Sequence, residues 1–212
     1  MSIDNTAAES RIYGEARADL IDLPEGEASI DLLACAGPDW SVDGNAAFMD
    51  RLAQLFAALN IAAELRTVVL GPAMQWALTN GGVLGSRNII YSPEREAPKQ
   101  TGLRLMYVDG VRGLARSLWQ LQVPHAWVIG DAVTYGHLMP YCRRAYIVPD
   151  DQSSASGQTM PALCVAAGWQ HERTFDRICG SGRRSAMLKY VNSRWLRLEG
   201  KRSTGYGHYN TV

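Results

Sequence analysis

The chain has 212 residues, of which 47% are hydrophobic, and this is enough for one domain with a sizeable buried core. Lys plus Arg and Asp plus Glu both number 21, so a general affinity for nucleic acid or for an anionic membrane surface is not expected. The N-terminus lacks the basic and apolar regions of a secretory signal, and no run of about 18 apolar residues could span a membrane. These features indicate a cytoplasmic protein that binds neither nucleic acid nor a membrane.

The charges are distributed unevenly between the two ends of the chain. Residues 1–28 contain seven acidic residues and two arginines, whereas basic residues gather after residue 182. We expect a polar acidic extension over 1–28, one domain over 29–195 and a basic, flexible tail over 196–212. The tails can contact each other, mediate self-association or simply be solvated, and the sequence leaves the oligomeric state open.

The cysteines and histidines show no metal-binding pattern. The four cysteines have no CxxC spacing, and several lie within apolar runs, so we interpret them as reduced core thiols. His125 and His137 have no second ligand at a metal-binding spacing, so no metal site is predicted. The cysteines are Cys35, Cys142, Cys164 and Cys179.

Short apolar runs alternate with helical patterns along most of the chain. An apolar run without polar alternation is typical of a strand that is buried on both faces of a parallel sheet. The predicted strands are 29–36, 67–70, 87–91, 103–108, 125–129 and 144–149. Apolar residues at helical spacing over 52–59 and 111–119, the second behind a capping Asp109, predict helices between them.

The last third of the chain has a different pattern. Residues 170–178 and 185–192 flank a Gly-Ser-Gly sequence and predict an antiparallel hairpin that closes the sheet. Together the segments predict an α/β fold, a doubly wound and mainly parallel sheet with a C-terminal antiparallel hairpin.

Two strand-to-helix junctions are the most informative local feature. The apolar runs that end at Gly71 and Gly130 both continue into helix-compatible segments. Glycine lets the backbone approach a ligand closely, and a helix N-terminus offers unpaired N–H groups to an anion. The pair therefore favours a diphosphate held between two helix starts. The alternative, ordinary tight turns of an α/β protein, is about equally well supported.

Several short segments and single residues occur in a characteristic order. The segments are 67–71 followed by Trp76, then 84–92, then 128–130 followed by Tyr135 and by 138–140; the single residues are Tyr146, Thr159 and Trp169. In this order they resemble the dihydrofolate reductase family, from residue 29 to about residue 192. The resemblance implies a dihydrofolate-reductase-like fold that binds NADPH at the C-terminal edge of its sheet and transfers hydride to a protonated pterin.

The resemblance also implies which residues form the site. The implied NADPH-binding residues are Gly71, Met74, Ser92, Gly130, Asp131, Ala132, Val133 and Thr134. The implied residues for a pterin or folate substrate are Cys35, Leu55, Phe56, Leu59, Ser86, Ile129 and Tyr135. An alternative role for Phe56, Leu59 and Tyr135 is plain helix core, and Thr134 can equally be a packing residue.

The chain departs from the family at four positions of this site. Leu55 stands where the family has its acid, and Ser86 replaces the arginine that holds the folate carboxylate. Asp131 replaces the second glycine of a glycine pair, where it hinders a cis peptide bond and adds a negative charge near the expected diphosphate. The basic residue expected after Gly71, which reads the extra phosphate of the cofactor, is Pro72 or Ala73.

Asp50 is the acidic residue nearest to the missing acid, and it is our candidate proton donor. Its alternative role is to cap the helix that starts after it. The resemblance implies NADPH-dependent reduction of dihydrofolate or a related pterin, with insensitivity to diaminopyrimidine antifolates. Two alternatives stay open: a reductase of another small heterocycle, and a non-catalytic scaffold or assembly subunit that has kept the fold.

Overall fold

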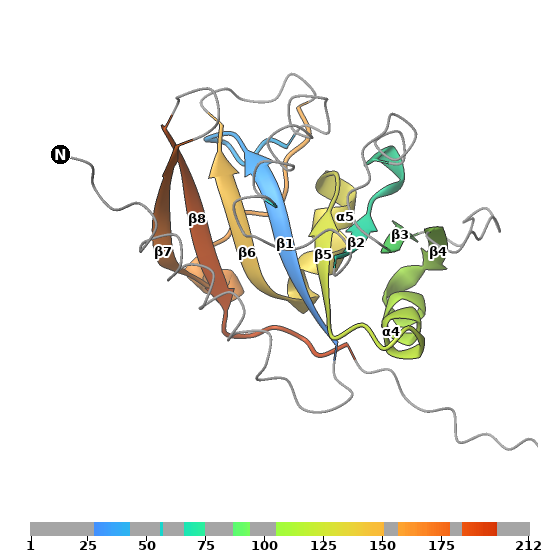
Figure 1. The fold of residues 1–212 in the computed structure, drawn as a ribbon. Helices are drawn as coiled ribbons and strands as arrows, with labels where there is room; N and C mark the ends of the chain where they lie inside the picture. The colour runs from blue at the N-terminus through green and yellow to red at the C-terminus, as the bar shows by residue number, and fades with distance from the viewer. Residues whose placement is uncertain are drawn as a thin grey trace, which may run out of the picture.

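The computed structural model describes residues 28–42, 56, 66–74, 87–93, 105–150, 157–178 and 184–198. Its centre is an eight-stranded sheet with the strand order β4-β3-β2-β5-β1-β6-β8-β7 (Figure 1). The strands are β1 (Ser29–Ala36), β2 (Thr67–Leu70), β3 (Arg87–Ser92), β4 (Leu105–Asp109), β5 (His125–Ile129), β6 (Cys142–Pro149), β7 (Trp169–Ile178) and β8 (Arg184–Asn192). The described helices are α4 (Gly110–Gln120) and α5 (Ala132–Leu138), and the short 3-10 turns are η2 (Pro72–Met74), η3 (Met139–Tyr141) and η4 (Val165–Ala167).

The sheet is parallel except at one end. All neighbouring pairs from β4 to β6 run parallel, whereas β8 is antiparallel to β6 and β7 is antiparallel to β8. The predicted α/β fold with a C-terminal antiparallel hairpin is therefore confirmed. The strand boundaries shift slightly, because β4 begins at Leu105 rather than 103 and β6 begins at Cys142 rather than 144.

Each face of the sheet has its own apolar core. In β1, Ile30, Leu32 and Ala34 belong to one cluster, and Leu33 and Cys35 belong to the other. This alternation follows from the period of two of a β-strand. Both faces are buried, which is why β1 reads as a run with almost no polar residue.

Helix α4 follows β4 and packs against β4 and β3, at the end of the sheet away from the hairpin (Figure 1). Leu114, Ala115 and Leu118 form its buried face. Trp119, which the helical spacing placed on this face, is 40% exposed instead, because it lies at the edge of the apolar stripe. Asp109 is the N-cap residue as predicted, although its side chain makes no capping hydrogen bond.

The chain stays attached to the domain beyond β8. Leu196 donates its N–H to the Pro140 carbonyl at 2.8 Å, and Leu198 is buried and forms an antiparallel bridge with Ala28. The boundary predicted at 195 therefore falls inside a segment that contacts the domain. The reason is apolar burial, because Leu198 covers the start of β1 as part of the first core cluster.

The cysteines only partly follow the expectation of core thiols. Cys35 and Cys142 are free and buried, and burial raises the pKa of the Cys142 thiol. Cys164 is exposed, which corrects the expectation; it directly precedes the exposed turn η4. Cys179 lies outside the described residues. Within the described part of the chain, no helix is long and apolar enough to cross a membrane, and no group of three potential ligands could hold a metal ion.

Candidate functional site at the carboxyl edge of the sheet

The two strand-end glycines lie side by side, as parallel pairing requires. Leu70 at the end of β2 pairs with Ile129 at the end of β5. The Gly71 N–H then donates to the Ile129 carbonyl at 3.3 Å, so the two junctions are joined by a hydrogen bond. The predicted juxtaposition of Gly71 and Gly130 is thus present in the structure.

The side chain of Thr134 explains why both positions are glycine. A Cβ added to Gly71 would overlap the Thr134 Oγ1 and lie 3.1 Å from Asp131 Oδ2, and one added to Gly130 would lie 2.6 Å from Thr134 Cβ. Thr134 is fully buried, and its hydroxyl has no hydrogen-bond partner among the described residues. The space beside the two glycines is therefore filled by the protein itself, which agrees with the tight-turn alternative.

Asp131 caps the helix that follows. Its backbone is extended, and its Oδ1 accepts the Thr134 N–H at 2.8 Å, as an N-cap carboxylate does. The peptide bond between Gly130 and Asp131 is trans, like every other bond of the described residues. One N–H group that was predicted to meet a diphosphate is therefore already bound by a carboxylate.

On the other side of the junction, Tyr135 connects α5 to the central strand. Its hydroxyl donates to the Leu33 carbonyl at 2.9 Å, and the whole side chain is buried. Burial raises the pKa of Tyr135 far above its ordinary value. The hydroxyl therefore stays protonated at neutral pH and acts as a fixed hydrogen-bond donor rather than as an acid.

Three of the residues predicted to line a ring-binding site belong to the second core cluster: Cys35 near the end of β1, Ile129 at the end of β5 and Phe56. Tyr135 belongs to the first cluster, on the other face of the sheet. Phe56 is fully buried, its ring meets Trp127 edge to face with centroids 6.0 Å apart, and the Arg66 guanidinium carbon lies 4.5 Å from the Phe56 ring centroid. Phe56 thus packs within the core, and its role in lining a ring-binding site stays a prediction.

The remaining predicted site residues are dispersed. Met74 is fully buried and donates its N–H to the Gly71 carbonyl at 2.9 Å, while Ser92 is half-buried at the end of β3. Ala132 is half-buried and Val133 is 54% exposed in the first turn of α5. Asp50, Leu55, Leu59 and Ser86 lie outside the described residues, so their roles stay predictions.

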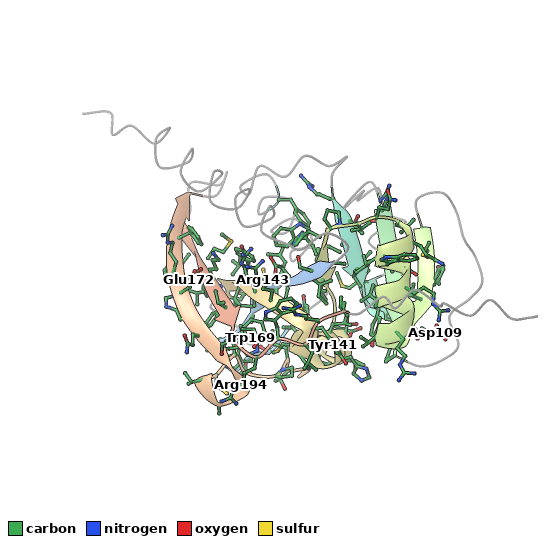
Figure 2. All side chains as sticks on the ribbon, turned by 90° about the horizontal axis from the view of Figure 1, so that it is seen from below. Asp109, Tyr141, Arg143, Trp169, Glu172 and Arg194 are labelled. Atoms are coloured by element: carbon green, nitrogen blue, oxygen red, sulfur yellow. The ribbon has the colours of Figure 1, made fainter. Side chains whose placement is uncertain are left out.

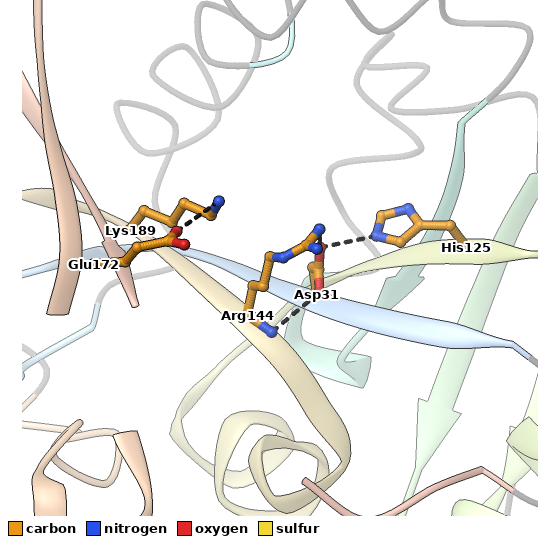
Figure 3. Close-up of polar contacts among 5 residues, drawn as sticks. All are labelled: Asp31, His125, Arg144, Glu172 and Lys189. Atoms are coloured by element: carbon orange, nitrogen blue, oxygen red, sulfur yellow. Dashed lines mark hydrogen bonds and ion pairs between the residues drawn. The ribbon is translucent and has the colours of Figure 1, made fainter. Parts of the chain in front are cut away.

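A buried ionic cluster at the opposite ends of the strands was not predicted from the sequence. Asp31 in β1 lies between His125 in β5 and Arg144 in β6 (Figure 3). Asp31 Oδ1 accepts the Arg144 backbone N–H at 3.1 Å, and Oδ2 lies 3.8 Å from the Arg144 guanidinium and 3.1 Å from His125 Nε2. The His125 contact has ion-pair distance without the alignment of a hydrogen bond. A charged residue inside an apolar strand was the available signal, because buried charges are almost always paired.

Charged residues also mark the two ends of the sheet. Figure 2 labels Asp109 beside α4 and Glu172 on the hairpin. Glu172 Oε2 accepts from Lys189 Nζ at 2.6 Å, next to the buried cluster in Figure 3. This pair is partly exposed and contributes little, whereas Asp31 and Arg144 are both below 10% exposed and depend on each other.

The fold is similar to that of a solved enzyme. Dihydrofolate reductase from Enterococcus faecalis, in complex with NADP(H) and RAB-propyl, matches with a TM-score of 0.59 over 78% of this chain and 96% of that chain, at 12% identity. The chain has a dihydrofolate-reductase-like fold. No family model and no curated protein matches the sequence. At 12% identity the similarity shows a shared fold and does not by itself show a shared substrate or cofactor.

Proposed function

We propose that this chain is an oxidoreductase that binds dihydrofolate or a related pterin and reduces it with a nicotinamide cofactor. The observation that supports this most strongly is the hydrogen bond from Tyr135 to the Leu33 carbonyl. It ties Tyr135, in the first core cluster, to the backbone of Leu33, which belongs to the second cluster together with Cys35 and Ile129, the positions where the resemblance puts the pterin ring. The fold, which spans 96% of a dihydrofolate reductase, supports the same proposal.

In this proposal the described residues bind and orient the ring. Cys35 and Ile129 supply apolar walls at the strand ends, and the buried Tyr135 holds the Leu33 carbonyl in place. Tyr135 does not supply the proton, because burial holds its pKa too high. The proton would come from Asp50 or from solvent, as the sequence predicts.

NADPH is the cofactor that the resemblance implies, and its diphosphate does not fit the β5–α5 junction. The Asp131 carboxylate already accepts the Thr134 N–H there, and Thr134 fills the space beside Gly71 and Gly130. An anion placed at this junction would lie next to a carboxylate of the same charge. The proposed binding of the cofactor therefore does not rely on diphosphate contacts at this junction.

The Asp131 cap also favours a second candidate, a non-catalytic domain that has kept this fold. A self-capped helix N-terminus is complete without any nucleotide. The domain would then serve as a scaffold or assembly subunit, and it would bind neither NADPH nor dihydrofolate.

A binding and turnover experiment separates the two candidates. We expect dihydrofolate to raise the melting temperature of the purified full chain, since a ligand that binds only the native state must stabilise it. We also expect dihydrofolate-dependent oxidation of NADPH or NADH, followed by absorbance. Cys35→Leu should weaken dihydrofolate binding, because the larger side chain would take up space at the proposed ring site. Cys164→Leu makes the same change at an exposed position and serves as the control. Absence of any thermal shift and of any turnover would refute the enzyme and leave the non-catalytic candidate.

The missing acid makes a further part of the proposal testable. Diaminopyrimidine inhibitors bind as cations against the carboxylate that Leu55 replaces, and a buried cation without a partner costs several kcal/mol. We expect the unmodified protein to be insensitive to them and Leu55→Asp to restore inhibition. Asp50→Asn should abolish reduction at neutral pH if Asp50 supplies the proton; wild-type turnover of this variant across pH 5–8 would refute that role.

A further inference from the structure

The β5–α5 junction contains a negative charge of its own at the place where two strand ends converge. Asp131 Oδ1 binds the first turn of α5 through the Thr134 N–H. Its second oxygen, Oδ2, faces the end of β2, since it lies 3.1 Å from the position that a Cβ on Gly71 would take. The carboxylate thus spans the two junctions that the sequence placed around a diphosphate.

The junction offers an anion few groups that the protein does not already use. Asp131 Oδ1 accepts the Thr134 N–H, Oδ2 faces Gly71, and the buried Thr134 Oγ1 has no partner among the described residues. In the first turn of α5, the Thr134 N–H and the Tyr135 N–H both bind Asp131. The negative charge beside these groups opposes an anion, whereas the unpartnered hydroxyl suits a neutral group such as a ligand hydroxyl.

We infer that Asp131 acts as an internal anion that closes this junction to a dinucleotide diphosphate, and that it thereby determines which cofactor the chain accepts. This inference rests on the proposed function, because it concerns the cofactor of the same site. Reduced nicotinamide riboside, which has the reactive ring and its ribose but no phosphate, should bind at least as well as NADPH. The phosphates and the adenosine half should bring no net affinity, because the diphosphate meets the carboxylate.

The test uses two isosteric charge removals at the same edge of the sheet. Asp131→Asn keeps an oxygen that can accept the Thr134 N–H, and Asn caps helices as well as Asp does, so the cap is kept while the carboxylate becomes a neutral amide. Asp109→Asn is the matched control. Asp109 also ends a parallel strand and precedes a helix, but its side chain makes no capping bond and α4 lies at the far end of the sheet (Figure 2).

The dissociation constants of NADPH and reduced nicotinamide riboside are measured by calorimetry for the wild type and both variants. In the wild type, NADPH should bind no more tightly than the riboside. Asp131→Asn should tighten NADPH binding by about ten- to a hundredfold, the effect of one charge-assisted contact, and change riboside binding by less than about threefold. Asp109→Asn should match the wild type.

The outcomes distinguish this inference from the proposed function. Wild-type protein that binds NADPH more than tenfold tighter than reduced nicotinamide riboside overturns the inference, even if dihydrofolate is reduced. No gain for NADPH in Asp131→Asn also overturns it, including the case in which nothing binds any variant. A gain in Asp131→Asn together with no reduction of dihydrofolate by any variant supports the inference and refutes the proposed reductase.

Discussion

Thr134 should couple energetically to Gly71 and Gly130 in two different ways, and a double-mutant cycle can measure this. Gly71→Ala places a methyl group on the Thr134 Oγ1 and 3.1 Å from Asp131 Oδ2. Overpacking of this kind typically costs about 1–3 kcal/mol. For a chain of this length that corresponds to a fall in melting temperature of about 2–12 °C.

Thr134→Ala should rescue Gly71→Ala more fully than Gly130→Ala. The closest atom to the new methyl in Gly71→Ala is the Thr134 hydroxyl oxygen, which Thr134→Ala removes. In Gly130→Ala the new methyl lies 2.7 Å from Thr134 Cγ2, which an alanine at 134 removes, and 2.6 Å from Thr134 Cβ, which it retains. We therefore expect a favourable coupling energy of about 1–2 kcal/mol for the first pair and a clearly smaller one for the second, whose Cβ clash remains.

Urea denaturation followed by far-ultraviolet circular dichroism gives the unfolding free energies for this cycle. The unfolding free energy must fall with urea concentration at the same slope in all variants for the comparison to hold, since this slope reports the surface exposed on unfolding. The packing argument is refuted if Gly71→Ala is as stable as the wild type, or if Thr134→Ala rescues both glycine variants to the same extent.

Three further predictions concern the core and the ends of the domain. Asp31→Asn should lower the unfolding free energy in urea by about 3–5 kcal/mol, because the buried Arg144 loses its carboxylate, and Arg144→Met should recover part of that loss; equal stability of the single and double variants would contradict this. Tyr135→Phe should cost about 1–3 kcal/mol, since the Leu33 carbonyl loses its donor. Because the folded-state pKa of Tyr135 is raised, the wild type should lose stability as the pH rises above the ordinary tyrosine value of 10.0, and Tyr135→Phe should lose less; parallel pH profiles by thermal melting would count against it. Deletion of residues 1–24 should leave a folded domain with an unchanged far-ultraviolet spectrum, and an insoluble product would place the domain boundary earlier.

Much of the sheet could be predicted from the sequence because its strands are buried on both faces. The runs at 29–36, 67–70 and 125–129 match β1, β2 and β5 to the residue. The predicted start of β6 lacked Cys142 and Arg143, whereas Arg144 was already part of the predicted strand. The charges of Asp31 and Arg144 within apolar strands were visible in the sequence, but their pairing joins residues far apart in the chain and has no local pattern.

The candidate site shows the same limit at the level of single residues. A glycine at a strand end indicates a close approach, but the sequence does not say whether a ligand or a side chain approaches. At Gly71 and Gly130 it is the side chain of Thr134. The negative charge of Asp131 was anticipated, whereas its second role as a helix cap depends on the extended backbone that the structure shows at this residue.

These two roles of Asp131 lead to opposite demands on the same side chain. As an N-cap it stabilises α5 by about 1 kcal/mol, and as a carboxylate it opposes an anion at the same N–H groups. Asp131→Gly removes the charge and the capping oxygen together, so a loss of stability could mask a gain in cofactor affinity. Asp131→Asn removes the charge and keeps a capping oxygen. If its NADPH affinity rises while its melting temperature stays at the wild-type value, then the charge closes the junction, and the cap could have been kept without it.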